Sequence, residues 1–390
     1  MEHIERTQIK VSPKIRLIGW GLVWLGVALS SLGYIVDARE TAFNNVLNFL
    51  FLASIGIGAL FFLALEYVTG AVWSVPIRRV NEFLARLVPF AALLAIPILF
   101  NLDSVFAWAQ KDIAVSDALL RMKEPYLNRS FFTLRFFGIF IVWIMFIRLL
   151  TRNSTRQDAT GDQRLTKINT ILSAIFMPVF ALTLTIFAVD WGMSLDPHWY
   201  STIYGIYFFS GTATASLAAL TLVTAVLYER GFFPKLRRDH FYNLGALLFT
   251  FVNFWAYIAF SQFMLVWYAN LPEETSWFIA RWHGGWEYIS IALILVQFAV
   301  PYFVLLPQEA KMNIRTLRRM AVWLLFAHAL DLYWLIMPAF SATPPLGWME
   351  ISFPILIAGV VLIVLGWQVQ NLSLVPVGDP KLKRGLEFRL

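Results

Sequence analysis

The sequence predicts an all-α membrane protein in which ten transmembrane helices form a single integral membrane domain over residues 1–390. Its composition is the first reason: hydrophobic residues make up 59% of the chain and charged residues 14%, whereas soluble domains carry roughly 25% charged residues. The second reason is that apolar runs of about twenty residues recur along the chain, each long enough to cross a bilayer as a helix. Helices are expected because a segment in lipid must satisfy its backbone polar groups internally.

The apolar runs define the expected spans and the division of the chain. We expect a tail and first span in 1–45, a first half in 46–190, a second half in 191–338, and a last span with its tail in 339–390. The ten spans are expected near 16–36, 46–68, 87–108, 131–150, 168–190, 203–228, 242–268, 286–306, 319–338 and 350–368.

Lys and Arg are distributed unevenly between the two sides of these spans. If the amino terminus is placed in the cytoplasm, 24 of the 31 basic residues are cytoplasmic, and seven lie outside: Arg39, Lys111, Arg121, Lys123, Arg129, Arg135 and Arg281. Positive charge in short loops marks the cytoplasmic side, so both termini are expected to be cytoplasmic. The net charge of +7 therefore reflects topology and does not indicate a nucleic-acid partner. No cleavable signal peptide is expected, because no small-residue cleavage site follows the first apolar run.

A weak internal repeat relates the two halves of the chain. The pair Arg78-Arg79 lies 29 residues before Trp108, and the pair Arg237-Arg238 lies 29 residues before Trp267. A shift of 159 residues carries spans two to four onto spans six to eight in the same orientation. This pattern predicts two tandem four-helix bundles, spans 2–5 and 6–9, flanked by spans 1 and 10. The alternative is chance, since Arg pairs recur at inner ends and Trp recurs at interfaces.

The residue inventory excludes several kinds of cofactor. The chain has no cysteine, which excludes disulfides, thiolate-bound iron-sulfur clusters and covalently attached c-type haem. Of its five histidines, only His328 is expected inside the bilayer, whereas a membrane b-type haem held by two histidines needs a second. There is no phosphate-binding Gly-rich loop, zinc motif or nucleophile-base-acid set. We therefore expect no catalytic residue, no metal site and no bound cofactor on this chain.

A short polar hinge at residues 190–205 joins the two halves. It holds Asp190, Asp196 and His198 beside four aromatic residues, a mixture typical of a membrane-water boundary. Titratable groups at such a boundary can exchange protons with water. The alternative is that Asp196-Pro197 forms a tight turn and that the aromatic residues are an interfacial belt.

One pair of ionisable residues is expected deep in the membrane. His328 and Asp331 lie three residues apart in span nine and therefore on one helical face, His328 near the midplane and Asp331 in the outer half. A charged group there costs roughly 2.5 to 3.5 kcal/mol, so its presence suggests function. A neutral histidine beside an acid can relay protons. The alternative is a structural hydrogen bond that ties span nine to its neighbours.

The other candidates lie nearer the two ends of the spans. Glu66, near the inner end of span two, is the candidate for proton uptake, although it could instead snorkel to the interface. Asp103, Asp190 and Glu287 are expected in the outer half, where they would suit proton release or a quinol pocket, or merely reach interfacial water. The small residues of 210–216 are expected to serve packing, or else to lend hydroxyls to a water chain. With His198, His328 and Asp331, these acids complete the candidate proton path.

Two stretches resemble a known family. They are Asp190-Trp-Gly-Met-Ser-Leu-Asp-Pro-His-Trp-Tyr-Ser-Thr202 and Gln262-Phe-Met-Leu-Val-Trp-Tyr-Ala-Asn-Leu-Pro-Glu-Glu-Thr275. Both resemble the ActF family of membrane subunits of alternative complex III, a bacterial quinol:electron-acceptor oxidoreductase, and more widely the NrfD-like subunits of the polysulfide reductase group. Through the ten-span topology the likeness covers essentially the whole chain.

The resemblance implies a function and a set of partners. It implies two four-helix bundles, a place in the bacterial cytoplasmic membrane, and a translocase-type subunit without redox centres. The implied partners are an NrfD-like sister subunit that binds menaquinol, a periplasmic iron-sulfur protein, multihaem and monohaem c-type cytochromes, small membrane subunits and lipid. Such subunits are expected to conduct protons, coupled to quinol oxidation in the sister subunit. The electron acceptor would be a cytochrome c or another periplasmic protein.

Three other functions compete with proton conduction. The chain could itself bind quinol, with outer-half acids and aromatic residues around the ring in its first bundle. It could be a secondary transporter, although these tend to have inverted repeats. It could also be a structural anchor for periplasmic cytochromes, which predicts that its intramembrane acids tolerate neutral replacement. The sequence shows no continuous polar chain between Glu66 and His328, so a proton path there needs waters or hydroxyls.

Overall fold

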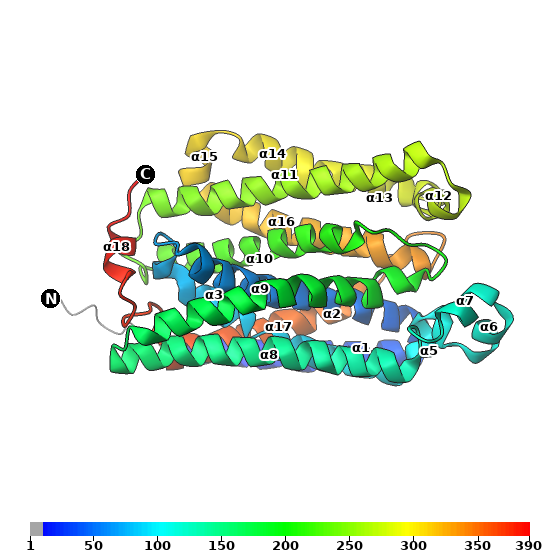
Figure 1. Cartoon of the computed structure of the whole chain (residues 1–390), viewed down its shortest axis with the longest axis horizontal. Helices are drawn as coiled ribbons and strands as arrows, with labels where there is room; N and C mark the ends of the chain where they lie inside the picture. Colours follow the sequence, from blue (N-terminus) through cyan, green and yellow to red (C-terminus); the bar gives the residue numbers. More distant parts are fainter. Residues whose placement is uncertain (1–10) are drawn as a thin grey trace.

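The computed structural model describes residues 11–390, and the predicted amino-terminal tail with Arg6 and Lys10 lies largely outside them. In the described range, ten helical segments are long and apolar enough to cross a membrane, which confirms the predicted number and indicates a multi-pass membrane protein. The segments lie side by side along one axis (Figure 1). They are Pro13–Val36, Ala38–Thr69, Val75–Phe100, Arg129–Thr160, Arg164–Leu195, Tyr204–Glu229, Arg238–Ala269, Trp286–Leu305, Ile314–Ala339 and Met349–Asn371.

Several of these spans are built from more than one helix. The helices are α1 (Pro13–Val36), α2 (Ala38–Thr69), α3 (Arg78–Ala85), α4 (Val88–Phe100), α5 (Leu102–Val105), α6 (Lys111–Ser116), α7 (Ala118–Lys123), α8 (Arg129–Thr160), α9 (Arg164–Trp191), α10 (Tyr204–Glu229), α11 (Arg238–Ala269), α12 (Pro272–Ile279), α13 (Trp286–Leu293), α14 (Val300–Leu305), α15 (Gln308–Met312), α16 (Ile314–Ile336), α17 (Met349–Asn371) and α18 (Leu382–Leu386).

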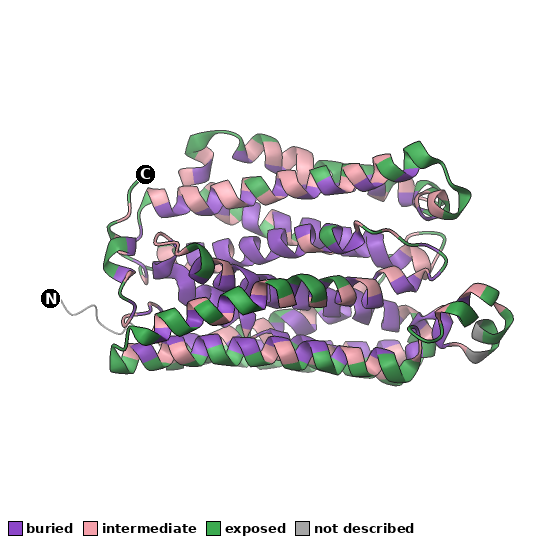
Figure 2. Cartoon of the chain, viewed as in Figure 1, coloured by how far each residue is buried: buried purple, intermediate pink, exposed green. Residues whose placement is uncertain are grey.

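Helices α2 and α10 form the centre of the molecule, and both are buried on nearly every side (Figure 2). Helix α2 packs against α4, α9 and α10, and α10 packs in turn against α11 and α16. Helix α1 lies on the outside against α17, and its large apolar side chains, such as Leu17 and Trp24, are exposed. An apolar helix with an uncovered face suits contact with lipid, whereas α2 and α10 are surrounded by protein and bury polar as well as apolar side chains.

The contact between α2 and α10 depends on small residues. A Cβ atom on Gly58 would lie 2.5 Å from the Cβ of Ser216, so only glycine allows this approach of the two helices. One turn earlier, the hydroxyl of Thr212 bonds the hydroxyl of Ser54 at 3.4 Å across the same interface. In both pairs the partners are 158 residues apart, close to the shift of 159 that relates the two halves. The first helices of the two halves therefore run parallel and in contact.

The third span differs from its predicted position at 87–108. It begins at Val75 and ends at Phe100, because the charged segment of α3 is helical and buried where a polar connection was expected. Proline at position 89 cannot continue a helix from the preceding turn, so the chain is interrupted after α3 and restarts as α4 at Val88. Helix α4 ends at Asn101, whose φ of −126° and ψ of 45° are not helical.

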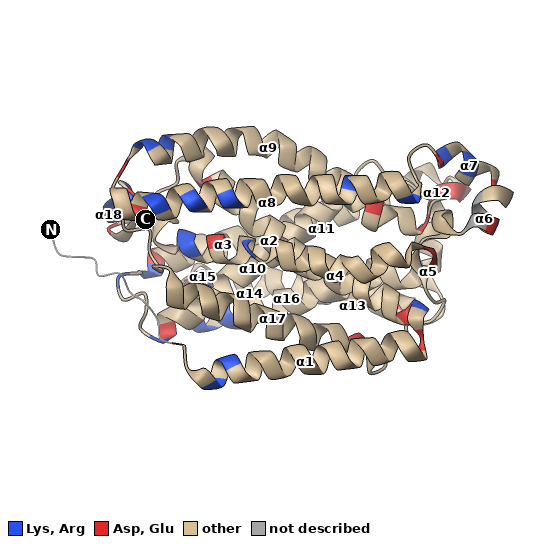
Figure 3. Cartoon of the chain, turned by 90° about the horizontal axis from the view of Figure 1, so that it is seen from below, with Lys and Arg blue, Asp and Glu red and all other residues tan. Residues whose placement is uncertain are grey.

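The two ends of the molecule differ in charge. Lys and Arg gather at the end where α18 lies (Figure 3). There the carboxy-terminal segment 372–390 folds across the helix ends: Lys381 donates its Nζ to the carbonyl of Gly70 at 3.1 Å, and His240 Nε2 lies 2.8 Å from the carbonyl oxygen of Gly385. We call this the basic end, and it is the end that the sequence predicts to be cytoplasmic.

Candidate functional site

Asp331 is buried between three helices. It lies on α16 with 1% of its surface exposed, accepts a hydrogen bond from Tyr207 Oη of α10 at 2.5 Å, and accepts another from Trp255 Nε1 of α11 at 3.1 Å. This carboxyl therefore ties α16 to its neighbours, as the structural alternative expects. The same contacts hold this carboxyl in the interior of the second half of the chain.

His328 lies one turn before Asp331 and is equally buried. Within residues 11–390, neither of its ring nitrogens has a hydrogen-bond partner. A Cβ atom on Gly211 of α10 would lie 3.2 Å from His328 Nδ1 and 3.3 Å from Asp331 Oδ2, so both groups border the same glycine without bonding each other. A buried imidazole without a partner is costly, and a water molecule bonded to a ring nitrogen would satisfy it.

Helix α10 carries hydroxyl groups along most of its length. Six of its Ser and Thr residues are completely buried: Ser210, Thr212, Thr214, Ser216, Thr221 and Thr224. The first three bond within the helix or to Ser54, whereas the last three have no partner among the described residues. The stretch from Tyr207 to Thr224 covers about 25 Å at the helical rise per residue. Residues of α10 lie beside the residues of α2 that are 158 positions earlier in the chain, so Thr224 is level with Glu66.

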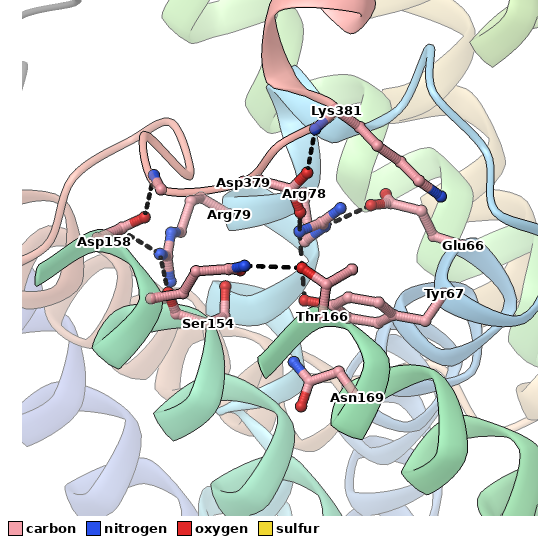
Figure 4. A network of polar contacts seen from close by, with 12 residues as sticks. Glu66, Tyr67, Arg78, Arg79, Ser154, Asp158, Thr166, Asn169, Asp379 and Lys381 are labelled. Carbon is pink, nitrogen blue, oxygen red and sulfur yellow. Dashed lines mark hydrogen bonds and ion pairs between the residues drawn. The ribbon is translucent and has the colours of Figure 1, made fainter. Parts of the chain in front are cut away.

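Glu66 does not snorkel to the surface. It is 5% exposed and forms an ion pair with Arg78, which also donates to Tyr67 Oη at 3.2 Å and to Asp379 at 2.5 Å (Figure 4). The second carboxyl oxygen of Glu66 has no partner in the described chain. Glu66 is therefore a buried, ion-paired acid at the basic end, with one carboxyl oxygen that has no hydrogen-bond partner among the described residues.

A second ion-pair cluster lies beside this one. Arg79, which is completely buried, pairs with Glu82 at 2.5 Å. It also pairs with Asp158 of α8 (Figure 4). Ser154 accepts from Arg79 through its carbonyl at 3.1 Å and donates its hydroxyl to Glu82 at 2.7 Å. The backbone N–H of Gly378 reaches Asp158 at 3.0 Å, which joins the carboxy-terminal segment to the cluster. These ion pairs close the basic end of the interior, and the Nε of Arg79 has no hydrogen-bond partner among the described residues.

Sequence reasoning missed most of this network. It used Arg78 and Arg79 as orientation signals and as markers of the internal repeat, and did not single out Glu82, Asp158 or Asp379. A usable signal was present in Glu66 and Glu82, which flank the Arg pair within one short stretch between apolar runs. Nothing local could have identified Asp379, which lies 301 residues beyond Arg78.

Asp190 has a structural partner. It is 2% exposed and accepts two hydrogen bonds from the guanidinium of Arg135, at 2.8 and 2.9 Å. Tyr126 packs its ring 3.9 Å from that guanidinium. The bidentate pair fixes α8 against α9, so this acid does not simply reach interfacial water.

Two further candidates lie at the surface. Asp103 was expected in the outer half of span three, but the span ends at Phe100; Asp103 lies beyond it in α5, half-exposed and 3.2 Å from Arg129. Glu287 lies in the first turn of α13, where its Oε2 accepts the backbone N–H of Gly285 at 2.9 Å. Neither acid lies beside Asp331, so the structure does not bring the outer acids together.

His198 of the hinge is exposed and contacts a different loop. Its Nε2 lies 2.7 Å from Asp117 Oδ2, and Lys123 donates its Nζ to the carbonyl of Pro197 at 2.6 Å. Desolvation opposes ionisation of Asp117, but the backbone N–H of Leu120 and the His198 ring outweigh it and hold the pKa of that carboxyl below its usual value. The hinge is thus a docked surface turn at the outer end.

Comparison with known proteins identifies no relative. No protein-family model matches the chain, and no curated protein matches it in sequence. Across the part of the chain that the structure describes, no group of three or more His, Asp or Glu side chains is placed to hold a metal ion.

Proposed function

We propose that this chain is a proton-conducting membrane subunit of a quinol-oxidising complex in the bacterial cytoplasmic membrane, similar to the ActF family of alternative complex III. The ten spans and the two resembling stretches support this proposal. The proposed partners are an NrfD-like sister subunit that binds menaquinol, an iron-sulfur protein, c-type cytochromes and small membrane subunits. Electrons pass through those partners, and this chain holds none of the redox centres.

Helix contacts support the proposed two-bundle arrangement. In the first half, α2 contacts α4 and α9, and α8 contacts both of these. In the second half, α10 contacts α11 and α16, while α13 and α14 pack against α16 and α11 respectively. The parallel contact of α2 with α10 fits a repeat in the same orientation and counts against the inverted repeats of many secondary transporters.

One observation carries the proton-conducting role. The unpartnered imidazole of His328 and the carboxyl of Asp331 border Gly211 on the same helix that carries buried, unpartnered hydroxyls down to the level of Glu66. Polar groups that line a buried route let bound waters pass protons between them. These hydroxyls supply the connection that the sequence left open between Glu66 and His328.

The proposed route has an inner and an outer part. A proton taken up at Glu66 passes along the α10 hydroxyls and intervening waters to His328 and Asp331. Tyr207 then bonds Asp331 and lies one turn from the buried Tyr204, which leads toward the hinge at the outer end. The other candidates are dispersed around that end and can accept protons only after these have passed Asp331. They are Asp103, Asp190, His198 and Glu287.

Membership of a redox complex is tested by isolation. The tagged chain, extracted from its native membranes in a mild detergent, should co-purify with an iron-sulfur protein and with haem that absorbs as a c-type cytochrome in a reduced-minus-oxidised spectrum. An unrelated tagged protein from the same membranes serves as the control. A chain that came away alone and colourless would contradict the proposal.

The hydroxyl route is tested by replacing Thr221 and Thr224 together with valine. Valine has nearly the same shape but cannot bond a proton-carrying water, so proton translocation by the complex in vesicles should fall by about three- to tenfold. A pH-sensitive dye outside the vesicles measures the protons, and the rate of quinol oxidation is followed in parallel.

The matched control is Thr250→Val on α11, an exposed position whose hydroxyl bonds only the carbonyl of Ala246. This variant should translocate protons at the rate of the unmodified complex. Equal rates in the double variant and in this control would show that protons do not follow α10.

A further inference from the structure

A cavity of about 510 Å³ lies in the second half of the chain, between α11, α12, α13 and α16. Ligand pockets in proteins measure roughly 300 to 1,000 Å³. The cavity is placed toward the outer end, because Gln262 and Trp277 on its wall lie near the outer end of α11 and in α12. None of the described residues on its wall is charged. It therefore suits an uncharged molecule.

The amide of Gln262 faces this cavity without a partner. Gln262 is 3% exposed, lines the cavity, and makes no hydrogen bond within the described structure. Asn253, on the same wall, donates its Nδ2 to the carbonyl of Phe249 at 2.7 Å and makes no other contact. A buried amide is normally satisfied on both its N–H and carbonyl sides. The wall therefore offers the amide N–H groups of Gln262 as donors and the side-chain carbonyl oxygens of Gln262 and Asn253 as acceptors.

Aromatic rings supply most of the remaining wall. Two contacts fix the orientation of Trp277, which lines the cavity. The ring of Trp199 stacks on it with the centroids 4.5 Å apart and 13° between the planes, and the guanidinium carbon of Arg281 lies 3.4 Å from its centroid. Arg281 donates to backbone carbonyls of Trp277, Trp334 and Leu335; burial lowers its pKa to about 9, so it stays charged at neutral pH behind the wall. Trp199 and Arg281 cover the faces of Trp277, so its ring edge borders the cavity. Other rings of the wall, such as Phe260 and Phe298, offer contact to a planar ring.

The cavity opens toward the lipid. Tyr257, Phe260 and Ile294 line it and are also exposed on the outer surface of the helices. Next to this opening the chain leaves the α-helical path, with a π-helical segment at Ile294–Ala299 just before Pro301. Such segments recur at functional sites. A molecule with an apolar tail could enter from the membrane and leave its tail there.

We infer that this cavity binds an uncharged planar ring that both donates and accepts hydrogen bonds and carries an apolar tail, the chemical class of quinols and long-chain phenols. Gln262 and Asn253 recognise the ring's oxygen groups, and the aromatic wall stacks on its face. The site lies in the second half of the chain and uses amides, whereas sequence reasoning placed a quinol site in the first half and used acids. Tyr207 and Trp255 form the wall that separates the ring from Asp331.

The test titrates the full-length chain in lipid nanodiscs with a decyl-substituted naphthoquinol, kept reduced under anaerobic conditions, and follows quenching of tryptophan fluorescence. The unmodified chain should show saturable quenching. Gln262→Leu keeps the size of the side chain but removes the amide, and it should raise the Kd at least about tenfold, since a buried partner is left unsatisfied. Ala259→Phe fills the cavity and should abolish saturable quenching.

The control is Thr250→Phe, which adds a ring of the same kind at an exposed position of α11 outside the cavity, and its Kd should match that of the unmodified chain. The same Kd in all four proteins, or non-saturable quenching throughout, would overturn the proposal and leave an acyl chain of ordinary lipid as the occupant. The titration involves no proton transfer, so its failure would leave the proposed proton route unaffected.

Discussion

Replacing Arg79 with leucine should lower the free energy of unfolding by about 3 to 5 kcal/mol, the cost of breaking a buried ion pair by removing one partner. Arg79 is completely buried and pairs with Glu82 and Asp158. Leucine would leave Glu82 charged in the interior with only Ser154 as a partner. Thermal or denaturant unfolding in detergent micelles measures the change.

Two comparisons separate this effect from a general loss of positive charge. Arg156→Leu removes an exposed cation from α8, near Asp158, and should change the free energy of unfolding by no more than about 0.5 kcal/mol. The double variant Arg79→Leu with Glu82→Leu should recover part of the loss, because it removes the unpaired charge of Glu82, while Asp158 keeps the N–H of Gly378 but still loses its ion pair. If Arg79→Leu were as stable as Arg156→Leu, the cluster would contribute nothing to the fold.

The number of spans could be predicted because the bilayer imposes length and apolarity on every crossing segment. The limits of span three could not be predicted, because they depend on contacts with residues that are distant in the sequence. Arg78 and Arg79 look like part of a polar loop, but they are buried in helix α3 because acids from α2, α8 and the carboxy-terminal segment neutralise them. Composition does not show which charges will be paired.

The candidate site was predictable to the extent that it lies within one helix. His328 and Asp331 are one turn apart in sequence, so their shared face follows from helical geometry alone. The partners of Asp331, Tyr207 and Trp255, are 124 and 76 residues away, and no local pattern connects them. Depth estimates failed for Asp103 because the break at Asn101 ends the helix before it.

Asp331→Asn should remove a buried proton-binding carboxyl group from the proposed route. Asparagine has nearly the same size and can still accept the hydrogen bond of Tyr207, but it cannot exchange a proton. We therefore expect the number of protons translocated per quinol oxidised to fall at least about tenfold, in line with the loss of a positioned acid-base group. The protein should still fold and assemble with some loss of stability, because the bond from Tyr207 and the packing of α16 persist while the amide NH2 cannot accept the bond from Trp255.

The most direct test counts protons released outside vesicles that contain the intact complex, beyond those released by quinol oxidation itself. Asp162→Asn, an exposed change of the same kind, provides the control. If protons pass through Asp331, the Asp331→Asn variant loses most of this additional proton release, while the Asp162→Asn control retains it. Unchanged proton release by Asp331→Asn in a complex that still oxidises quinol would contradict a proton route through this chain.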